Sequence, residues 1–212
     1  MYLPKLFEET RVDVLHALIR EHGFATVVTL AAGALNANHL PLLIDPEPEP
    51  FGTLHGHVSR ANSMWHDTSP DLDALAIFHG PESYISPTLY PTKQETGKVV
   101  PTWNYVVVHA YGRLRFYEDR DRLLGHVRQL TGRHEGGRPE PWSVSDAPED
   151  YVAGQLRGIV GLDMTITRLI GKWKVSQNRP AVDRQGVVDG LSAGDDNAAA
   201  MAALVKERGG QS

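Results

Sequence analysis

Four hydrogen-bonding side chains stand side by side in the segment VPTWNYVVVHAYG, residues 100–112: Thr102, Trp103, Asn104 and Tyr105. The valine run behind them predicts a buried β-strand. Since strand side chains alternate between two faces, Thr102 and Asn104 share one face and Trp103 and Tyr105 share the other. The first face can hydrogen-bond the edge of a heterocycle, and the second can pack against a ring. The alternative is a core strand whose aromatic end packs under a loop.

A second polar group, SRAN, directly follows a predicted strand and consists of Ser59, Arg60, Ala61 and Asn62. Backbone N–H groups at a strand-to-turn junction, next to a serine and an arginine, suit a phosphate. An arginine can bind phosphate through two parallel hydrogen bonds. The alternative is an ordinary turn in which Ser59 or Asn62 caps a helix.

A third group lies in KWKVSQNRP, residues 172–180, where cations alternate with neutral polar side chains. Its members can complete an anion site or hydrogen-bond a ring edge: Lys174, Gln177, Asn178 and Arg179. The alternative is a solvated loop after the last strand.

Other chemistry has weaker support. His55 and His57 share a strand face, as two metal ligands would, but His79 is no convincing third ligand, so no metal site is predicted. The chain has no cysteine, which excludes disulfides and thiolate chemistry. It also lacks the GxSxG, P-loop and GxGxxG motifs. Catalytic residues stay unassigned, with His109 and Tyr105 as the obvious acid–base groups.

These segments are expected on a mainly β, mostly antiparallel barrel with peripheral helices. The predicted strands cover residues 24–30, 35–44, 52–58, 71–79, 100–116 and 159–170. The predicted helices cover residues 5–22, 119–134, 148–156, 180–191 and 195–206. Gly80 and Pro81 are expected to end the fourth strand. The polar segment 84–98 is expected to be a functional loop.

Composition and charge limit the function classes. The chain has 212 residues, 41% of them hydrophobic, and a formal net charge of −5. Because this charge lacks the electrostatic footprint of a nucleic-acid binder, DNA binding is not favoured. Without a secretory signal or a long apolar stretch, a soluble, cytoplasmic protein is expected.

Six motifs resemble, in the same order, the PaiB-type "FMN-binding negative transcriptional regulators": MYLPKLF, HLPLLID, GHVSRAN, FHGPESYISPTLY, VPTWNYVVVHAYG and KVSQNR. The resemblance implies an FMN-binding split β-barrel related to pyridoxamine-phosphate oxidase. It also implies a homodimer with FMN at the subunit interface. Ser59 and Arg60 are similar to the phosphate-binding pair of split barrels. Residues 102–105 would line the flavin pocket, and Lys174 and residues 177–179 would reach the same flavin or the partner subunit's.

The expected domains are a split-barrel domain over residues 1–191 and a helical tail over residues 192–212. Two functions are considered for this chain. The first is a flavin-dependent redox protein or flavin sensor. The alternative is a DNA-binding repressor for which FMN is a regulatory ligand, with a local basic patch drawn from Arg128, Arg133, Lys172 and Lys174. A haem-binding split barrel is a third class. FAD is less favoured than FMN, because no dinucleotide fingerprint is present.

Overall fold

The structure is a computed structural model that describes residues 1–209. Within these residues the strands are β1 (Glu8–Glu9), β2 (Phe24–Ala31), β3 (Ala34–Pro41), β4 (Leu43–Asp45), β5 (Thr53–Ser59), β6 (Ala74–Ile85), β7 (Thr102–Tyr117) and β8 (Ile159–Lys174). The helices are α1 (Val12–Glu21), α2 (Met64–Asp67), α3 (Thr92–Thr96), α4 (Arg120–Glu135), α5 (Glu149–Arg157), α6 (Ala181–Leu191) and α7 (Asp196–Arg208). Short 3₁₀ turns lie at Lys5–Phe7, Pro87–Leu89 and Val144–Asp146.

The strands are hydrogen-bonded in the order β3-β2-β6-β7-β8-β5-β4, and β1 pairs with β8. Every pairing with a described register is antiparallel. This confirms the predicted antiparallel, strand-based fold. The chain divides into two compact units: unit 1 is Met1–Leu18, His79–Val108 and Ile170–Ser212, and unit 2 is Ile19–Phe78 and His109–Leu169. The predicted tail ends in residues 210–212, which lie outside the described part of the chain.

Unit 2 is built on a hairpin and a strand pair. The predicted β2–β3 hairpin is confirmed, and its turn places Ala32 at φ 50° and Gly33 at φ 82°. Two successive positive φ angles match the twist of the flanking strands. Alternate residues of β2 are buried, among them Ala25 and Val27 at 1% exposure. β5 pairs with β8 from Thr53 opposite Thr165 to Ser59 opposite Ile159.

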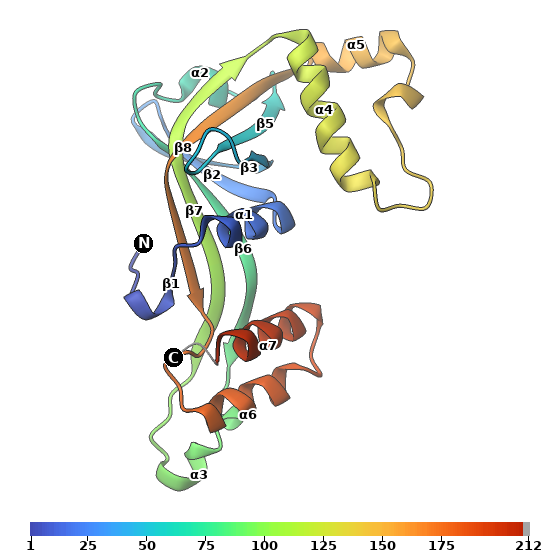
Figure 1. Cartoon of the computed structure of the whole chain (residues 1–212). Helices are drawn as coiled ribbons and strands as arrows, with labels where there is room; N and C mark the ends of the chain where they lie inside the picture. Colours follow the sequence, from blue (N-terminus) through green and yellow to red (C-terminus); the bar gives the residue numbers. More distant parts are fainter. Residues whose placement is uncertain (210–212) are drawn as a thin grey trace. The chain divides into compact units, whose positions relative to one another are not determined.

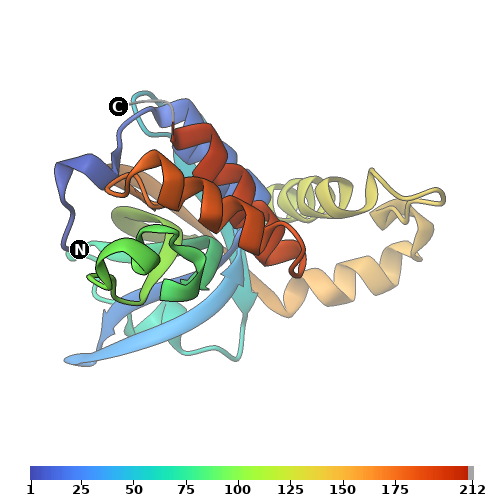
Figure 2. The same cartoon turned by 90° about the horizontal axis from the view of Figure 1, so that it is seen from below.

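Helices α4 and α5 belong to the same unit and lie side by side (Figures 1 and 2). The Asp119 carboxylate caps α4 by accepting a 2.8 Å hydrogen bond from the Arg122 backbone N–H. This bond satisfies a donor left free at the helix start. The predicted helix over residues 119–134 is therefore confirmed.

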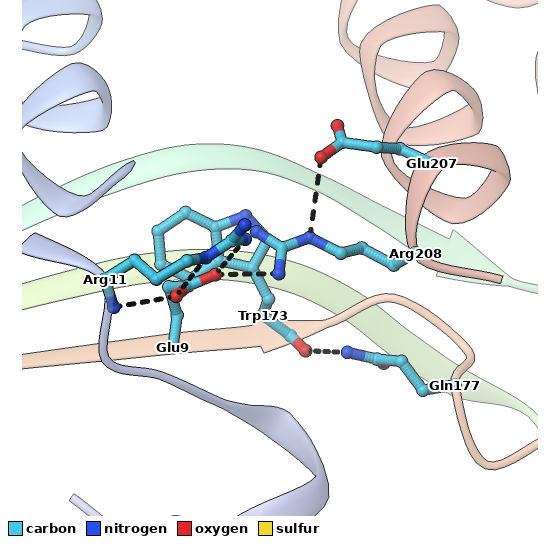
Figure 3. Close-up of polar contacts among 6 residues, drawn as sticks. All are labelled: Glu9, Arg11, Trp173, Gln177, Glu207 and Arg208. Carbon is cyan, nitrogen blue, oxygen red and sulfur yellow. Dashed lines mark hydrogen bonds and ion pairs between the residues drawn. The ribbon is translucent and has the colours of Figure 1, made fainter. Parts of the chain in front are cut away.

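Unit 1 carries the helix pair α6–α7, whose members lie next to each other in Figure 2. Met201 and Val205 of α7 and Val187 of α6 are fully buried. An ion pair of 2.7 Å joins Arg208 Nη1, in the last turn of α7, to Glu9 Oε2 of β1 (Figure 3). The predicted separation of residues 1–191 from a tail stays a prediction, but α7 is a packed part of unit 1.

The predicted helix over residues 5–22 is wrong at its start. Residues Lys5–Phe7 form a 3₁₀ turn, Glu8–Glu9 form β1, and the helix begins at Val12. β1 pairs with β8 at Lys172 and Gly171, which also extends β8 beyond the predicted end at residue 170. This long-range pairing overrides the local helical pattern.

The predicted break at Gly80 and Pro81 is also wrong, because β6 continues to Ile85. The described pairing of β6 with β2 ends at Ile77, so the missing N–H of Pro81 leaves that ladder intact. Further along β6, the Asn197 side chain of α7 donates to the Glu82 carbonyl at 2.5 Å and accepts from the Glu82 N–H at 3.3 Å. At Glu82 a side-chain amide thus makes the two hydrogen bonds that a neighbouring strand would make.

Candidate functional site

The two side-chain faces predicted for the start of β7 differ in burial at their central residues. Asn104 is 1% exposed, whereas Trp103 is 53% exposed. Trp103 forms an edge-to-face pair with the exposed ring of Tyr84, with centroids 6.0 Å apart. Tyr105 lies 5.0 Å from the Nζ of buried Lys172, in cation–π geometry. Of the two aromatic side chains here, Trp103 is therefore the one with an accessible ring.

Lys174 brings the end of β8 to the start of β7. Its Nζ donates to Thr102 Oγ1 at 2.5 Å and to the Trp103 carbonyl at 2.7 Å. Burial, followed by the positive charges of Lys172 and Arg179, lowers the pKa of Lys174. The structure thus joins the first and third sequence groups within unit 1. An additional anion nearby would relieve the repulsion between these cations.

The loop after β8 is shaped by its own side chains. Ser176 adopts φ 65°, which is uncommon for a residue with a Cβ and marks a constrained turn. Gln177 bridges the turn. Its Nε2 donates to the Trp173 carbonyl at 2.5 Å (Figure 3). Its Oε1 accepts from the Val175 N–H at 2.8 Å. Arg179 lies 4.6 Å from the Tyr90 ring centroid, and Asn178 is exposed.

Asn104 presents a buried hydrogen-bond acceptor that the described chain does not use. Its Nδ2 donates to Ser176 Oγ at 2.9 Å in a buried bond. Its Oδ1 is buried and has no hydrogen-bond partner among residues 1–209. A buried acceptor without a donor costs roughly 1–3 kcal/mol, so it is seldom left unpaired. The N–H of a bound heterocycle would satisfy this oxygen, so the residues present fit a flavin ring.

The second sequence group lies in unit 2 and forms a fixed turn after β5. Ser59 Oγ accepts from the Ala61 N–H at 3.3 Å, and Asn62 Oδ1 accepts from the Met64 N–H at 2.9 Å. The Arg60 N–H donates to the Gly158 carbonyl at 2.8 Å. The predicted turn is present, but the predicted helix cap is not, because the N-cap of α2 is Ser63 and neither Ser59 nor Asn62.

The Arg60 guanidinium already has protein partners. It donates to the Arg157 carbonyl at 2.8 Å and to a carboxylate oxygen of Glu118 at 2.5 Å. A cavity of about 430 Å³ lies beside it, and Arg120 and Arg157 also line this cavity. A phosphate entering the cavity would meet three arginines and would compete with Glu118 for Arg60.

Glu118 was missed from the sequence, because the two partners lie 58 residues apart and no motif connects them. Ser176 belongs to the third sequence group, residues 172–180, but nothing in the sequence assigned it a role in binding. Only the pairing of β7 with the end of β8 brings it to Asn104.

The histidines of β5 each pair with another side chain. His55 Nδ1 lies 2.7 Å from Asp163 Oδ1, and His57 Nδ1 lies 3.1 Å from His126 Nε2. Across residues 1–209, no group of three or more His, Cys, Asp or Glu side chains is arranged to hold a metal ion. No helix in that range is long and apolar enough to cross a membrane.

Comparison with a solved structure defines the class of fold. The flavocytochrome Anf3 from Azotobacter vinelandii superposes with a TM-score of 0.57 over 79% of this chain and 69% of that chain, at 12% identity. This likeness shows the split-barrel fold, as predicted. Residues 1–168 match the family described as "Putative FMN-binding domain", and the chain belongs to this family.

Two relatives extend the similarity over nearly the whole chain. An uncharacterized protein of Aspergillus fumigatus is 33% identical over an alignment 255 residues long. The alignment covers 99% of this chain and 98% of the relative. The protease synthase and sporulation protein PAI 2 of Bacillus subtilis is 31% identical over 209 residues, 98% of each chain. The resemblance to the PaiB-type family is therefore confirmed.

Proposed function

We propose that the chain binds FMN and acts as a flavin-dependent redox protein or flavin sensor. The ring is assigned to Thr102, Trp103, Asn104 and Tyr105, together with the cations and amides at Lys174, Gln177, Asn178 and Arg179. The phosphate is assigned to Ser59, Arg60, Ala61 and Asn62. The observation that carries the proposal is the buried, unpaired Oδ1 of Asn104 in a chain of an FMN-binding family.

The predicted homodimer and the predicted cytoplasmic location are parts of this proposal. Light scattering at micromolar protein tests the dimer, and a stable monomer would contradict it.

The bound flavin would supply the electron or hydride transfer, so the chain need only bind, orient and tune it. Asn104 offers an acceptor to a ring N–H. Lys174 and Arg179 add positive charge, which would stabilise a reduced, anionic flavin over the oxidised form. Trp103 offers an exposed ring face against which a planar group can stack.

The test adds FMN, FAD, riboflavin and haem separately to apo-protein and follows absorbance or ligand fluorescence. FMN should bind tightest, and Asn104→Ala should weaken it about ten-fold, as expected for one lost hydrogen bond. Ser176→Ala removes the same protein–protein bond but keeps the Asn104 acceptor, so it should change FMN affinity much less. Asn36→Ala, on β3 of unit 2, is the control for a general effect of losing an asparagine.

Circular dichroism must show that each variant is folded. If the wild type binds no flavin at tens of micromolar ligand, or if Asn104→Ala leaves FMN affinity unchanged in folded protein, the start of β7 is core and the proposal fails.

The second candidate is a negative transcriptional regulator, which the name of the Bacillus subtilis relative supports. Of the residues considered for a basic patch, Lys172 is 5% exposed and has little surface to offer DNA. Arg128 and Arg133 are exposed on α4. Titration with promoter DNA separates this function from the flavin function.

A further inference from the structure

Unit 2 contains a second cavity, of about 630 Å³, which shares no lining residue with the cavity beside Arg60. Its walls come from the end of α1, from β4 and β5, from the end of β7 and from one face of α4. The volume is within the range of small-molecule sites. None of the residues assigned to FMN lines it.

Three arginines line this cavity, against a single carboxylate, Asp45. Arg122 is held in place by the Tyr117 ring, whose centroid lies 3.9 Å from its guanidinium carbon, and by an ion pair with Asp163. Gly161 leaves room for that ring, since a Cβ there would lie 2.2 Å from it. Arg122 is therefore pre-positioned at the cavity wall.

The other two arginines, Arg20 and Arg133, carry uncompensated charge. Arg133 donates to the backbone carbonyl of Arg20, and neither guanidinium has an ion-pair partner among residues 1–209. Both residues line the cavity, so an anion bound there would supply the negative charge that these two cations lack.

The histidine pair lies at the same cavity. His126 lines it, is 5% exposed, and has an Nδ1 without a hydrogen-bond partner in the described chain. Burial, then the neighbouring His57 and His55, lower the pKa of His126 to about 4, and burial lowers the pKa of His57. Both rings are thus neutral at pH 7, and the fixed positive charge of the cavity comes from its arginines.

The lining also includes apolar side chains, those of Leu42, Ile44 and Pro46. A bare inorganic anion would leave these side chains in contact with water. A ligand with both a carboxylate and a compact apolar body would use both kinds of lining residue.

We propose that this cavity of unit 2 binds a small organic acid, with its carboxylate at Arg20, Arg122 and Arg133 and its apolar body against the apolar side chains of β4 and the residues on either side of it. The site is separate from the flavin site, and its occupancy does not depend on FMN.

The test is calorimetric titration of the full chain at pH 7 and low salt with benzoate, benzyl alcohol or inorganic phosphate. Benzoate should bind at least about ten-fold more tightly than the neutral alcohol and than phosphate. The double variant Arg20→Gln/Arg133→Gln should weaken benzoate about ten-fold or more. Arg128→Gln, on the same helix but outside the cavity lining, should leave it unchanged.

A second readout follows the imidazole NMR signals. Benzoate should shift the His126 and His57 signals in the wild type and not in the double variant. Benzoate affinity should be the same with and without saturating FMN.

Four results would each overturn the proposal. They are no benzoate binding at about 10 mM, equal losses in Arg128→Gln and the double variant, phosphate binding as tight as benzoate, and displacement of benzoate by FMN. The last would put benzoate in the flavin site.

Discussion

Glu9 Oε2 and Arg208 Nη1 lie 2.7 Å apart, so an ion pair fastens the last turn of α7 to the two-residue strand β1 (Figure 3). Arg11 binds the same carboxylate at 2.8 Å. Burial alone would raise the pKa of Glu9, but the hydrogen bonds from Arg11 and Arg208 outweigh it and lower the pKa to about 2. The pair is therefore ionised wherever the protein is folded at ordinary pH.

Removing one partner of this pair is expected to be costly. Glu9→Gln should lower the free energy of unfolding by about 3 kcal/mol, because it leaves the mostly buried Arg208 with only the more distant, exposed carboxylate of Glu207. Urea unfolding at pH 7 measures the loss. Glu207→Gln removes an exposed carboxylate 3.7 Å from the same arginine, and it should cost less than about 0.5 kcal/mol. Equal costs for the two variants would contradict the assigned role of Glu9.

The low pKa of Glu9 also sets a pH window. The unfolded carboxyl takes up a proton near pH 4.5, before the folded one does near pH 2, so the stability from this group is present above 4.5 and lost as the pH falls toward 2. The wild type should lose stability through this window, and Glu9→Gln should lose less. Unfolding free energies measured between pH 5 and pH 3 check this, and parallel curves would refute it.

The lowered pKa of His126 predicts a second loss of stability, at a higher pH than the loss caused by Glu9. Its folded pKa of about 4 lies below the ordinary 6.5, so the unfolded state binds the proton first. Stability should therefore fall by up to about 3 kcal/mol as the pH drops from 6.5 to 4. His126→Gln should flatten this part of the curve. The exposed His134 of the same helix is the control, and His134→Gln should keep the wild-type pH dependence of stability. If His134→Gln also flattened the curve, the loss of stability could not be assigned to His126.

Substitutions of Arg60 and of Glu118 should change the affinity for FMN in opposite directions. Arg60→Ala should weaken FMN about ten- to a hundred-fold and riboflavin little, because only FMN carries the phosphate. Glu118→Gln removes the carboxylate that competes for Arg60, so FMN affinity should rise a few-fold, on the order of a surface ion pair. Arg138→Ala, another exposed arginine paired with a carboxylate, is the control for charge alone. Equal losses of FMN and riboflavin in Arg60→Ala would make Arg60 structural.

Specific DNA binding is not expected. The net charge of −5 repels phosphate on average, and Lys172 is buried under Tyr2 and Tyr105. Promoter DNA and shuffled DNA, titrated at physiological salt, should bind equally weakly. A sub-micromolar affinity with clear promoter preference would restore the regulator as the principal function.

The sequence predicted β7 well, because its valine run and alternating faces are local properties. The same holds for the turn at Asn62, whose side chain binds a backbone N–H only two residues away. The continuation of β6 past Pro81 was not predictable, since it depends on where β2 stops pairing and on a side chain of α7.

For the candidate site too, local features were predictable from the sequence and partners distant in the sequence were not. Motifs indicated which polar groups gather, and the structure joins Lys174 to Thr102 as one cluster. The partners Glu118 for Arg60 and Asp163 for His55 lie 58 and 108 residues away and follow only from the strand order. The predicted FMN contacts themselves stay predictions.

The amide of Asn197, which binds both the N–H and the carbonyl of Glu82, has a consequence for solubility. A strand with free N–H and C=O groups at its edge is a template onto which a strand of another molecule can add. At this point of β6, one side chain occupies the groups that such a strand would need. Asn197 thus blocks strand addition at this one position of β6, a task that sheets otherwise leave to lysines, prolines or bulges.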